Sequence, residues 1–184
     1  MQRITALNPD TTTGKSKDLF NAVQTKLGMV PNMMRTMGNS PAVLNGYLSF
    51  SGALGGSSIG AKLGEQIALT VANANSCDYC NAAHSFIGEK LIGIDTATIQ
   101  AAKEGKSSDA KTQAALSFAK TLIAKKGKVS EGDINALKNA TFTDAEIAEI
   151  IAHTALNIFT NYFNNAVNVE VDFPKVELVA SAVV

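Results

Sequence analysis

The four prolines of this 184-residue chain stand at positions 9, 31, 41 and 174, so residues 42–173 lack the residue that most strongly interrupts helices. The same stretch is rich in alanine, the best helix former. Cap residues and glycine stops bound three helical segments within it, which run from Ser40-Pro41 to Gly55-Gly56, from Asp95 to Gly105 and from Ser108-Asp109 to Gly127. The chain is therefore expected to be all-α, with a bundle of about eight helices.

A further helix is marked by a capping box, in which Thr143 and Glu146 satisfy each other's backbone donors ahead of a long periodic run. The side chains of that run recur at helical spacing, at Ile147, Ile150, Ile151, Thr154, Ile158 and Tyr162. Alternating runs typical of strands are nearly absent, and only residues 176–180 have an extended character. With 46% hydrophobic residues and no linker or internal repeat, residues 1–184 are expected to form a single domain.

Charge and hydropathy exclude several classes of function. Sixteen basic and sixteen acidic residues give no net charge, so no field attracts a phosphate backbone or an anionic membrane. The N-terminus lacks the continuous apolar run of a secretory signal, and no segment is long and apolar enough to span a membrane. We expect a soluble, cytoplasmic protein with no nucleic-acid or membrane partner. In that reducing compartment a close cysteine pair is more often catalytic or metal-binding than a permanent disulfide.

The two cysteines of the chain form a Cys-x2-Cys pair at Cys77 and Cys80, with His84 four residues later and Glu65 twelve residues before the first thiol. A dithiol at this spacing can cycle between thiols and disulfide, and a neighbouring imidazole and carboxylate can move the protons that the cycle needs. Glu65 can approach the other three residues only if the chain bends near Asn75, so that contact is a hypothesis. Inert core packing does not explain the cysteine spacing, and the cluster therefore predicts redox chemistry.

The cysteine pair is expected to follow a junction between two helices. Residues 61–74 have a helical pattern, and Ser76 is a suitable N-cap for a helix whose first turn holds both thiols. There the helix dipole favours a thiolate, and Cα atoms about 5 Å apart allow a disulfide to close. Cys77, Cys80 and His84 would then share one stripe of the helix.

A structural zinc site is the main alternative, because Cys77, Cys80, His84 and His153 would make a Cys2His2 ligand set. His153, however, lies far along the chain on an aliphatic helix. Zinc also stabilises small modules with little core, whereas this chain has enough hydrophobic residues to fold without a metal. We expect no metal ion and no cofactor.

Together, Glu65, Cys77, Cys80 and His84 reproduce the Glu-x11-Cys-x2-Cys-x3-His signature that is specific to the AhpD-like alkylhydroperoxidases. These proteins belong to the wider carboxymuconolactone decarboxylase superfamily. Further resemblance to its peroxidase-related members lies in residues 28–32, 40–44 and 157–165. The resemblance thus extends over most of the chain and implies an AhpD-like helical bundle.

The resemblance implies a thiol-dependent peroxidase that reduces organic hydroperoxides in antioxidant defence, without haem or bound metal. In such proteins the second cysteine attacks the peroxide, so Cys80 would become a sulfenic acid, while Cys77 would donate a proton and then close the disulfide. Glu65 and His84 would relay protons. A lipoyl-bearing or thioredoxin-like dithiol protein would restore the thiols. The family also implies a homo-oligomer, as a trimer, hexamer or dimer.

One position departs from the family pattern. Some members carry a histidine just before the second cysteine, where this chain has Tyr79. A phenol titrates at about pH 10, so Tyr79 is a candidate hydrogen-bond donor but cannot act as an imidazole would. Two other activities stay open. One is a disulfide reductase with little peroxidase activity, and the other is an acid–base enzyme of the superfamily, such as a lactone-acid decarboxylase, that uses His84 and Glu65.

Four methionines, Met29, Met33, Met34 and Met37, crowd around Pro31. Methionine fills irregular gaps in protein cores, so core packing is the default interpretation. The alternative hypothesis is that part of this group lines an apolar mouth suited to alkyl hydroperoxides.

Overall fold

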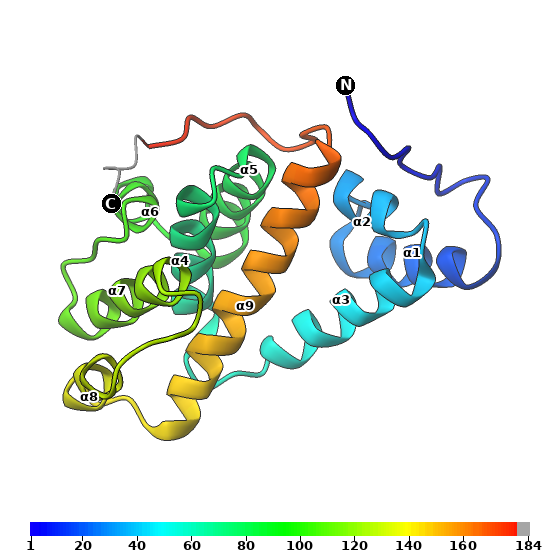
Figure 1. The fold of residues 1–184 in the computed structure, drawn as a ribbon. Coiled ribbons are helices and arrows are strands. Elements are labelled where there is room, and N and C mark those ends of the chain that lie inside the picture. The colour runs from blue at the N-terminus through cyan, green and yellow to red at the C-terminus, as the bar shows by residue number, and fades with distance from the viewer. Residues whose placement is uncertain (180–184) are drawn as a thin grey trace.

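The computed structural model describes residues 1–179, which form nine α-helices and one π-helical turn (Figure 1). The helices are α1 (Gly14–Leu27), α2 (Asn32–Met37), α3 (Pro41–Leu54), α4 (Gly60–Ala74), α5 (Asp78–Ile87), the π-helical η1 (Gly88–Ile92), α6 (Thr96–Lys103), α7 (Ala110–Ala124), α8 (Glu131–Asn139) and α9 (Asp144–Val167). The prediction of an all-α bundle is confirmed, since residues 1–179 contain no strand. Within the same residues, no helix combines the length and apolarity needed to cross a membrane.

The helix starts follow from the caps in the sequence. Ser40, Asp95 and Asp109 each accept a hydrogen bond from the backbone N–H three residues later, and so begin α3, α6 and α7. Thr143 and Glu146 form the expected capping box at the start of α9, a helix of 24 residues. The predicted starts of these four helices are confirmed.

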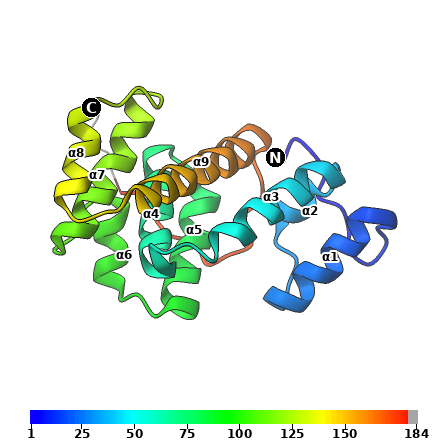
Figure 2. The same cartoon turned by 90° about the horizontal axis from the view of Figure 1, so that it is seen from below.

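Helix α4 forms the centre of the bundle and packs against α5, α6, α7 and α9. The long α9 runs beside it and also contacts α3, α5, α7 and α8. In Figures 1 and 2, α1 to α3 lie at one end of the molecule and α6 to α8 at the other. The pair of α4 and α9 therefore links the two ends.

The core has two clusters of buried side chains. The first lies among α4, α6, α7, α8 and α9, and its largest members include Ile67, Leu69, Leu116, Phe118, Leu137 and Ile150. The second joins the N-terminal helices to α5 and the end of α9, and includes Phe20, Val23, Met33, Met34, Met37, Leu44, Cys77, Tyr79, Cys80 and Val167. The cysteine pair therefore lies where the N-terminal helices cover the centre of the bundle.

The junction between α4 and α5 differs by one residue from the prediction. Ser76 adopts a left-handed conformation with φ 49°, and the N–H of Cys77 donates to the carbonyl of Ala72 at 2.9 Å, which closes α4. An N-cap needs extended backbone, so Ser76 cannot be the cap of α5 and that expectation was wrong. Cys77 is the cap instead, and its Sγ accepts the backbone N–H of Cys80 at 3.3 Å. Of the two cysteines, only Cys80 lies in the first turn of α5.

The chain after α9 returns across α5 toward α6 (Figure 1). Asn73 on α4 fixes it there, because its side chain accepts the backbone N–H of Val179 at 3.0 Å and donates to the carbonyl of the same residue at 3.1 Å. Residues 176–179 lie in neither a helix nor a strand. Ala180, the last residue of the segment with predicted extended character, lies outside the described residues, as do residues 181–184 of the predicted single domain.

Candidate active site

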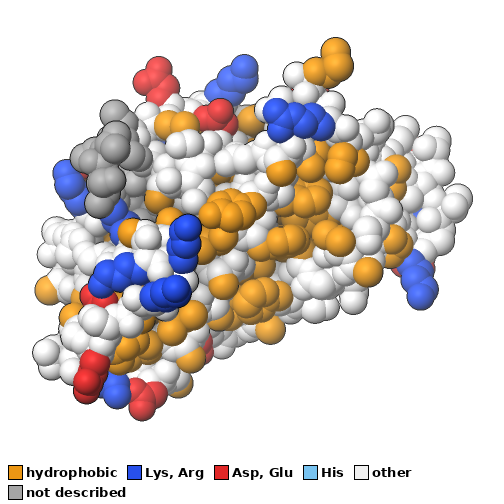
Figure 3. All heavy atoms as spheres, viewed as in Figure 1, with side chains coloured by type: hydrophobic (Ala, Val, Ile, Leu, Met, Phe, Trp, Pro, Cys, Tyr) orange, Lys and Arg blue, Asp and Glu red, His pale blue; other side chains and the backbone are white. Residues whose placement is uncertain are grey.

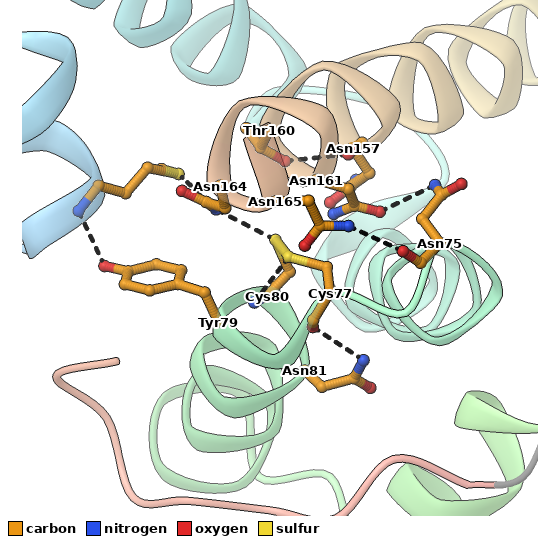
Figure 4. The surroundings of a disulfide bond; sticks show 11 residues. Asn75, Cys77, Tyr79, Cys80, Asn81, Asn157, Thr160, Asn161, Asn164 and Asn165 are labelled. Atoms are coloured by element: carbon orange, nitrogen blue, oxygen red, sulfur yellow. Dashed lines mark hydrogen bonds between the residues drawn. A yellow bond between two sulfur atoms is a disulfide. The ribbon is translucent and has the colours of Figure 1, made fainter. Parts of the chain in front are cut away.

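A disulfide joins Cys77 and Cys80, whose Cα atoms lie 5.3 Å apart (Figure 4). Both cysteines are buried, with Cys77 fully enclosed and Cys80 3% exposed. Cys80 borders a cavity, whereas Cys77 does not line it. Of the two cysteines, Cys80 is therefore the one that a molecule in the cavity can reach.

The cavity has a volume of about 300 Å³ and lies between α5, α9 and the first four helices. Most of its wall is apolar and comes from Leu27, Met29, Met33, Met34, Leu54, Ile87, Leu91, Leu156 and Phe173, among others. Three of the four clustered methionines thus line it, which favours the apolar-mouth hypothesis for them. Met37 is a core residue, 1% exposed. A wall of this composition suits an apolar substrate.

Glu65 on α4 and His84 on α5 meet in the wall of this cavity. Glu65 Oε2 lies 2.8 Å from His84 Nδ1, and the two side chains are 16% and 21% exposed. Burial acts to lower the pKa of His84, but the charge of Glu65 and hydrogen bonds with Glu65 and Asn157 raise that pKa above its ordinary value. The bend after α4 therefore does bring these two residues together. The raised pKa favours the protonated imidazole, which can donate a proton.

Two tyrosines also line the cavity. Burial raises the pKa of Tyr47 to about 12, against a hydrogen bond with Ser51 that lowers it. Burial likewise raises the pKa of Tyr79, whose hydroxyl accepts the backbone N–H of Met33 at 3.2 Å. The Tyr79 ring lies edge-on to Phe173, with centroids 5.8 Å apart. Both phenols are thus protonated at neutral pH, and Tyr79 holds α5 against α2.

Asn164 on α9 is a neighbour of the disulfide that the sequence did not single out. Its Nδ2 lies 3.2 Å from Cys80 Sγ and 3.3 Å from Met33 Sδ (Figure 4). A signal was present, because Asn157, Asn161 and Asn164 fall on one face of the helix, at spacings of four and three residues. All three are buried, and buried amides are costly unless they have partners. A row of asparagines on the packed face of a helix thus indicates a polar site.

No protein-family model matches the chain, and no curated protein matches its sequence. Two solved structures resemble it over almost their whole length. An uncharacterized peroxidase-related protein from Silicibacter sp. TM1040 has a TM-score of 0.82 and 25% identity, over 98% of this chain and 95% of that chain. The alkylhydroperoxidase AhpD core of an uncharacterized peroxidase-related protein from Ralstonia eutropha JMP134 has a TM-score of 0.82 and 24% identity, over 93% of this chain and 92% of that chain. The chain has the AhpD-like fold.

The debrominase Bmp8 has the AhpD-like fold as well. Its structure without ligand has a TM-score of 0.72 and 23% identity, over 86% of this chain and 86% of that chain. The complex of a cysteine-to-alanine variant with 2,3,4-tribromopyrrole has a TM-score of 0.76 and 22% identity, over 92% of this chain and 91% of that chain. At these identities the likeness shows the fold alone. Proteins that share the fold thus include peroxidase-related proteins and a debrominase.

The AhpD-like fold brings His153 closer to the site than its place in the sequence indicates. It lines the same cavity as Cys80, and its Nε2 lies 3.1 Å from Ser57 Oγ. Burial lowers the pKa of His153, against the charges of Glu149 and Glu65, which raise it. Distance along the chain was therefore a wrong reason to separate His153 from the cysteines. Among residues 1–179, however, no three His, Cys, Asp or Glu side chains are arranged to hold a metal ion, so the zinc ligand set is not assembled.

The two histidines of the chain should titrate on opposite sides of the ordinary midpoint of about pH 6.5. His84 should keep its proton above that pH and His153 should lose its proton below it. Because the pKa of His84 is raised on folding, its pairing with Glu65 stabilises the folded protein fully below about pH 6.5 and ceases to do so as the pH rises through the raised value. NMR of the ring signals, assigned with His153→Gln, measures both midpoints. A His84 midpoint at or below that of His153 would contradict the Glu65 contact.

Proposed function

We propose that the chain is a thiol-dependent peroxidase that reduces organic hydroperoxides to alcohols through a dithiol–disulfide cycle of Cys77 and Cys80. The observation that carries this proposal is the position of Cys80, which borders a largely apolar cavity while its disulfide partner is enclosed. Glu65 and His84 in the same wall can move protons. A dithiol and a proton donor in an apolar chamber suit a peroxide that carries an alkyl or aryl group.

In the first half of the cycle, the Cys80 thiolate attacks the terminal oxygen of the hydroperoxide. A sulfur–oxygen bond forms as the oxygen–oxygen bond breaks, so the sulfur loses two electrons and the peroxide gains them. The alkoxide leaves with the proton of the Cys77 thiol. The products are an alcohol, a sulfenic acid on Cys80 and a thiolate on Cys77.

In the second half, the Cys77 thiolate attacks the sulfenic sulfur of Cys80. The disulfide forms, the sulfur–oxygen bond breaks, and the hydroxide takes a proton from His84 and leaves as water. Glu65 stabilises the imidazolium that gives this proton. A lipoyl-bearing or thioredoxin-like dithiol protein then reduces the disulfide by thiol exchange, is itself oxidised to a disulfide, and returns one proton to His84.

Turnover with a small dithiol tests the proposal. The reduced protein should consume cumene hydroperoxide and dihydrolipoamide in equal amounts and release one equivalent of the alcohol. Chromatography of the alcohol and a thiol assay measure the two quantities. Failure of the fully reduced protein to consume hydroperoxide would exclude a peroxidase.

The same assay separates the other activities of the superfamily. A disulfide reductase would reduce a small disulfide and leave the hydroperoxide unchanged, and a lactone-acid decarboxylase would release carbon dioxide without any need for Cys80. Because a debrominase shares the fold, 2,3,4-tribromopyrrole belongs in the substrate panel. Release of bromide at the expense of the dithiol, with no peroxide turnover, would replace the peroxidase proposal.

Truncation of Met34 should weaken the binding of bulky hydroperoxides, because Met34 lines the cavity. Loss of about 1 kcal/mol of apolar contact in Met34→Ala should raise the KM for cumene hydroperoxide roughly fivefold and leave that for hydrogen peroxide unchanged. Met37→Ala is the matched control, since Met37 lies in the core. This substitution should lower thermal stability without changing substrate preference. Unchanged kinetics with both peroxides, in Met34→Ala and in Met33→Ala, would contradict a role for the methionines in substrate binding.

We also propose that the protein is a homo-oligomer. Large hydrophobic side chains stay exposed on α3 and α9, at Val43, Phe50, Ile151, Phe159 and Tyr162. Figure 3 shows hydrophobic side chains gathered across the middle of the face over which α9 runs in Figure 1. Because the chain has no net charge, a second copy could cover such a face without overall charge repulsion. Sedimentation equilibrium should give at least the mass of a dimer, and a monomer would contradict the proposal.

A further inference from the structure

The Asn164 side chain is buried beside the disulfide, and its hydrogen bonds offset only part of the free-energy cost of burying its amide. The residue is 2% exposed, and its Nδ2 lies within hydrogen-bonding distance of two sulfur atoms, Cys80 Sγ at 3.2 Å and Met33 Sδ at 3.3 Å (Figure 4). Its Oδ1 is buried without a hydrogen-bond partner among the described residues. Neutral sulfur is a weak acceptor, so these contacts repay little of the cost of burying an amide. The amide would gain much more from a sulfur atom that carries a negative charge.

The two cysteines receive their hydrogen bonds from different donors. Cys77 is the N-cap of α5, and its Sγ accepts the backbone N–H of Cys80 at 3.3 Å. That N–H and the positive end of the helix favour a thiolate on Cys77. Cys77, however, is fully enclosed and does not border the cavity. A reaction with a molecule in the cavity needs the charge on Cys80, and the side chain that donates to Cys80 Sγ is Asn164.

We propose that Asn164 is a catalytic residue whose side-chain amide donates a hydrogen bond to the Cys80 thiolate and so places the reactive charge on the cysteine that borders the cavity. This inference rests on the proposed role of Cys80 as the attacking thiol. It gives α9 a part in the chemistry, in addition to its packing against α4. It also explains why an amide, rather than an aliphatic side chain, packs against the disulfide.

The charged groups around Cys80 do not by themselves determine which cysteine carries the negative charge of the thiolate. A neutral hydrogen-bond donor can therefore determine it. Ionisable residues that line the cavity with it are Glu65, His84, Tyr47, Tyr79 and His153, and Cys77 lies behind it in the disulfide. Where His84 is protonated, its charge largely cancels that of Glu65 across their 2.8 Å contact. Both tyrosines are neutral at pH 7 because burial raises their pKa values, and His153 is neutral because burial lowers its pKa. The Asn164 hydrogen bond is therefore not outweighed by an unpaired charge in the cavity wall.

The test measures the ionisation of Cys80 without any peroxide. In a Cys77→Ser background Cys80 is the only thiol. Its alkylation by iodoacetamide, followed by intact mass between about pH 5 and pH 10, gives the midpoint at which the thiolate forms. Asn164→Leu should raise this midpoint by about one pH unit, which lowers the alkylation rate roughly tenfold at pH values below both midpoints. Asn164→Asp should raise it at least as much, because the carboxylate cannot donate and repels the thiolate.

Asn161→Leu is the matched control, since it also removes a buried amide from α9. The Asn161 amide is hydrogen-bonded to Asn75 and not to sulfur. It should leave the midpoint unchanged. An unchanged midpoint in both Asn164 variants would overturn the inference, and if Asn164→Leu fails to fold, the nearly isosteric Asn164→Asp decides alone. A raised midpoint in a protein without peroxidase activity would support the role of Asn164 and reject only the proposed function. Full peroxidase activity with an unchanged midpoint would support the proposed function and reject the role of Asn164.

Discussion

Replacement of Cys80 by serine should abolish hydroperoxide reduction, with a loss of at least about 10⁴-fold in turnover. Serine is not ionised at neutral pH and cannot accept an oxygen atom as a thiolate does. Cys77 cannot substitute for Cys80, because it is fully enclosed and does not border the cavity. The rate of alcohol release from cumene hydroperoxide, with dihydrolipoamide as reductant, measures the loss.

Cys77→Ser is the matched control, since it removes the other sulfur of the same pair. Without added dithiol, this variant should consume one equivalent of hydroperoxide and then stop, because the sulfenic acid on Cys80 has no thiol to attack it. Trapping with dimedone should place one adduct per chain on Cys80. If dimedone instead labels Cys77 in the Cys80→Ser variant, and the Cys77→Ser variant consumes no hydroperoxide, the attacking thiol is Cys77. The assignment of the two roles is then wrong.

Glu65→Gln should lower the rate of disulfide formation about 10²-fold at neutral pH, a typical loss when general acid–base catalysis is removed. The neutral amide cannot stabilise the His84 imidazolium across the 2.8 Å contact. Burial lowers the pKa of His84, and in this variant no neighbouring negative charge opposes that effect, so the pKa falls. Less of the proton donor is present at neutral pH, so the activity of the variant should recover in part as the pH is lowered. Stopped-flow rates after one addition of hydroperoxide, measured from about pH 5 to pH 9, test this.

Glu89→Gln provides the control for that substitution. Glu89 is exposed on η1 and pairs with Lys90 at 2.7 Å, so the same chemical change occurs outside the cavity. This variant should retain the full rate at every pH. A Glu65→Gln profile that coincides with those of the wild type and Glu89→Gln would remove Glu65 and His84 from the proton transfers of the cycle.

The fold could be predicted because its signals are local. A cap such as Ser40 or Thr143 acts on backbone N–H groups within three residues, and a proline acts on the turn that contains it. Such effects depend little on the rest of the structure. The one error at the cysteines arose because residue type alone made Ser76 the expected cap of α5. The left-handed backbone of Ser76, which closes α4, left the cap of α5 to Cys77.

The site could be predicted only in part, because much of it depends on contacts between distant residues. The spacing of Cys77, Cys80 and His84 was informative in itself, whereas the contact of Glu65 was a hypothesis that depended on a bend near Asn75. Asn164, by contrast, is 84 residues from Cys80 in sequence, and only the packing of α9 against α5 brings it to the sulfur. His153 reaches the same cavity in this way, and spacing along the chain does not reveal such contacts.

The most direct test of the dithiol cycle is the intact mass of the reduced protein after one equivalent of cumene hydroperoxide, and again after dihydrolipoamide. A dithiol peroxidase should lose two hydrogens, about 2 Da, as the disulfide between Cys77 and Cys80 forms. The dithiol should restore the original mass, and Cys80→Ser should show neither change. An unchanged mass in wild-type protein, with both thiols shown to be free before the peroxide is added, would contradict a peroxide-driven cycle.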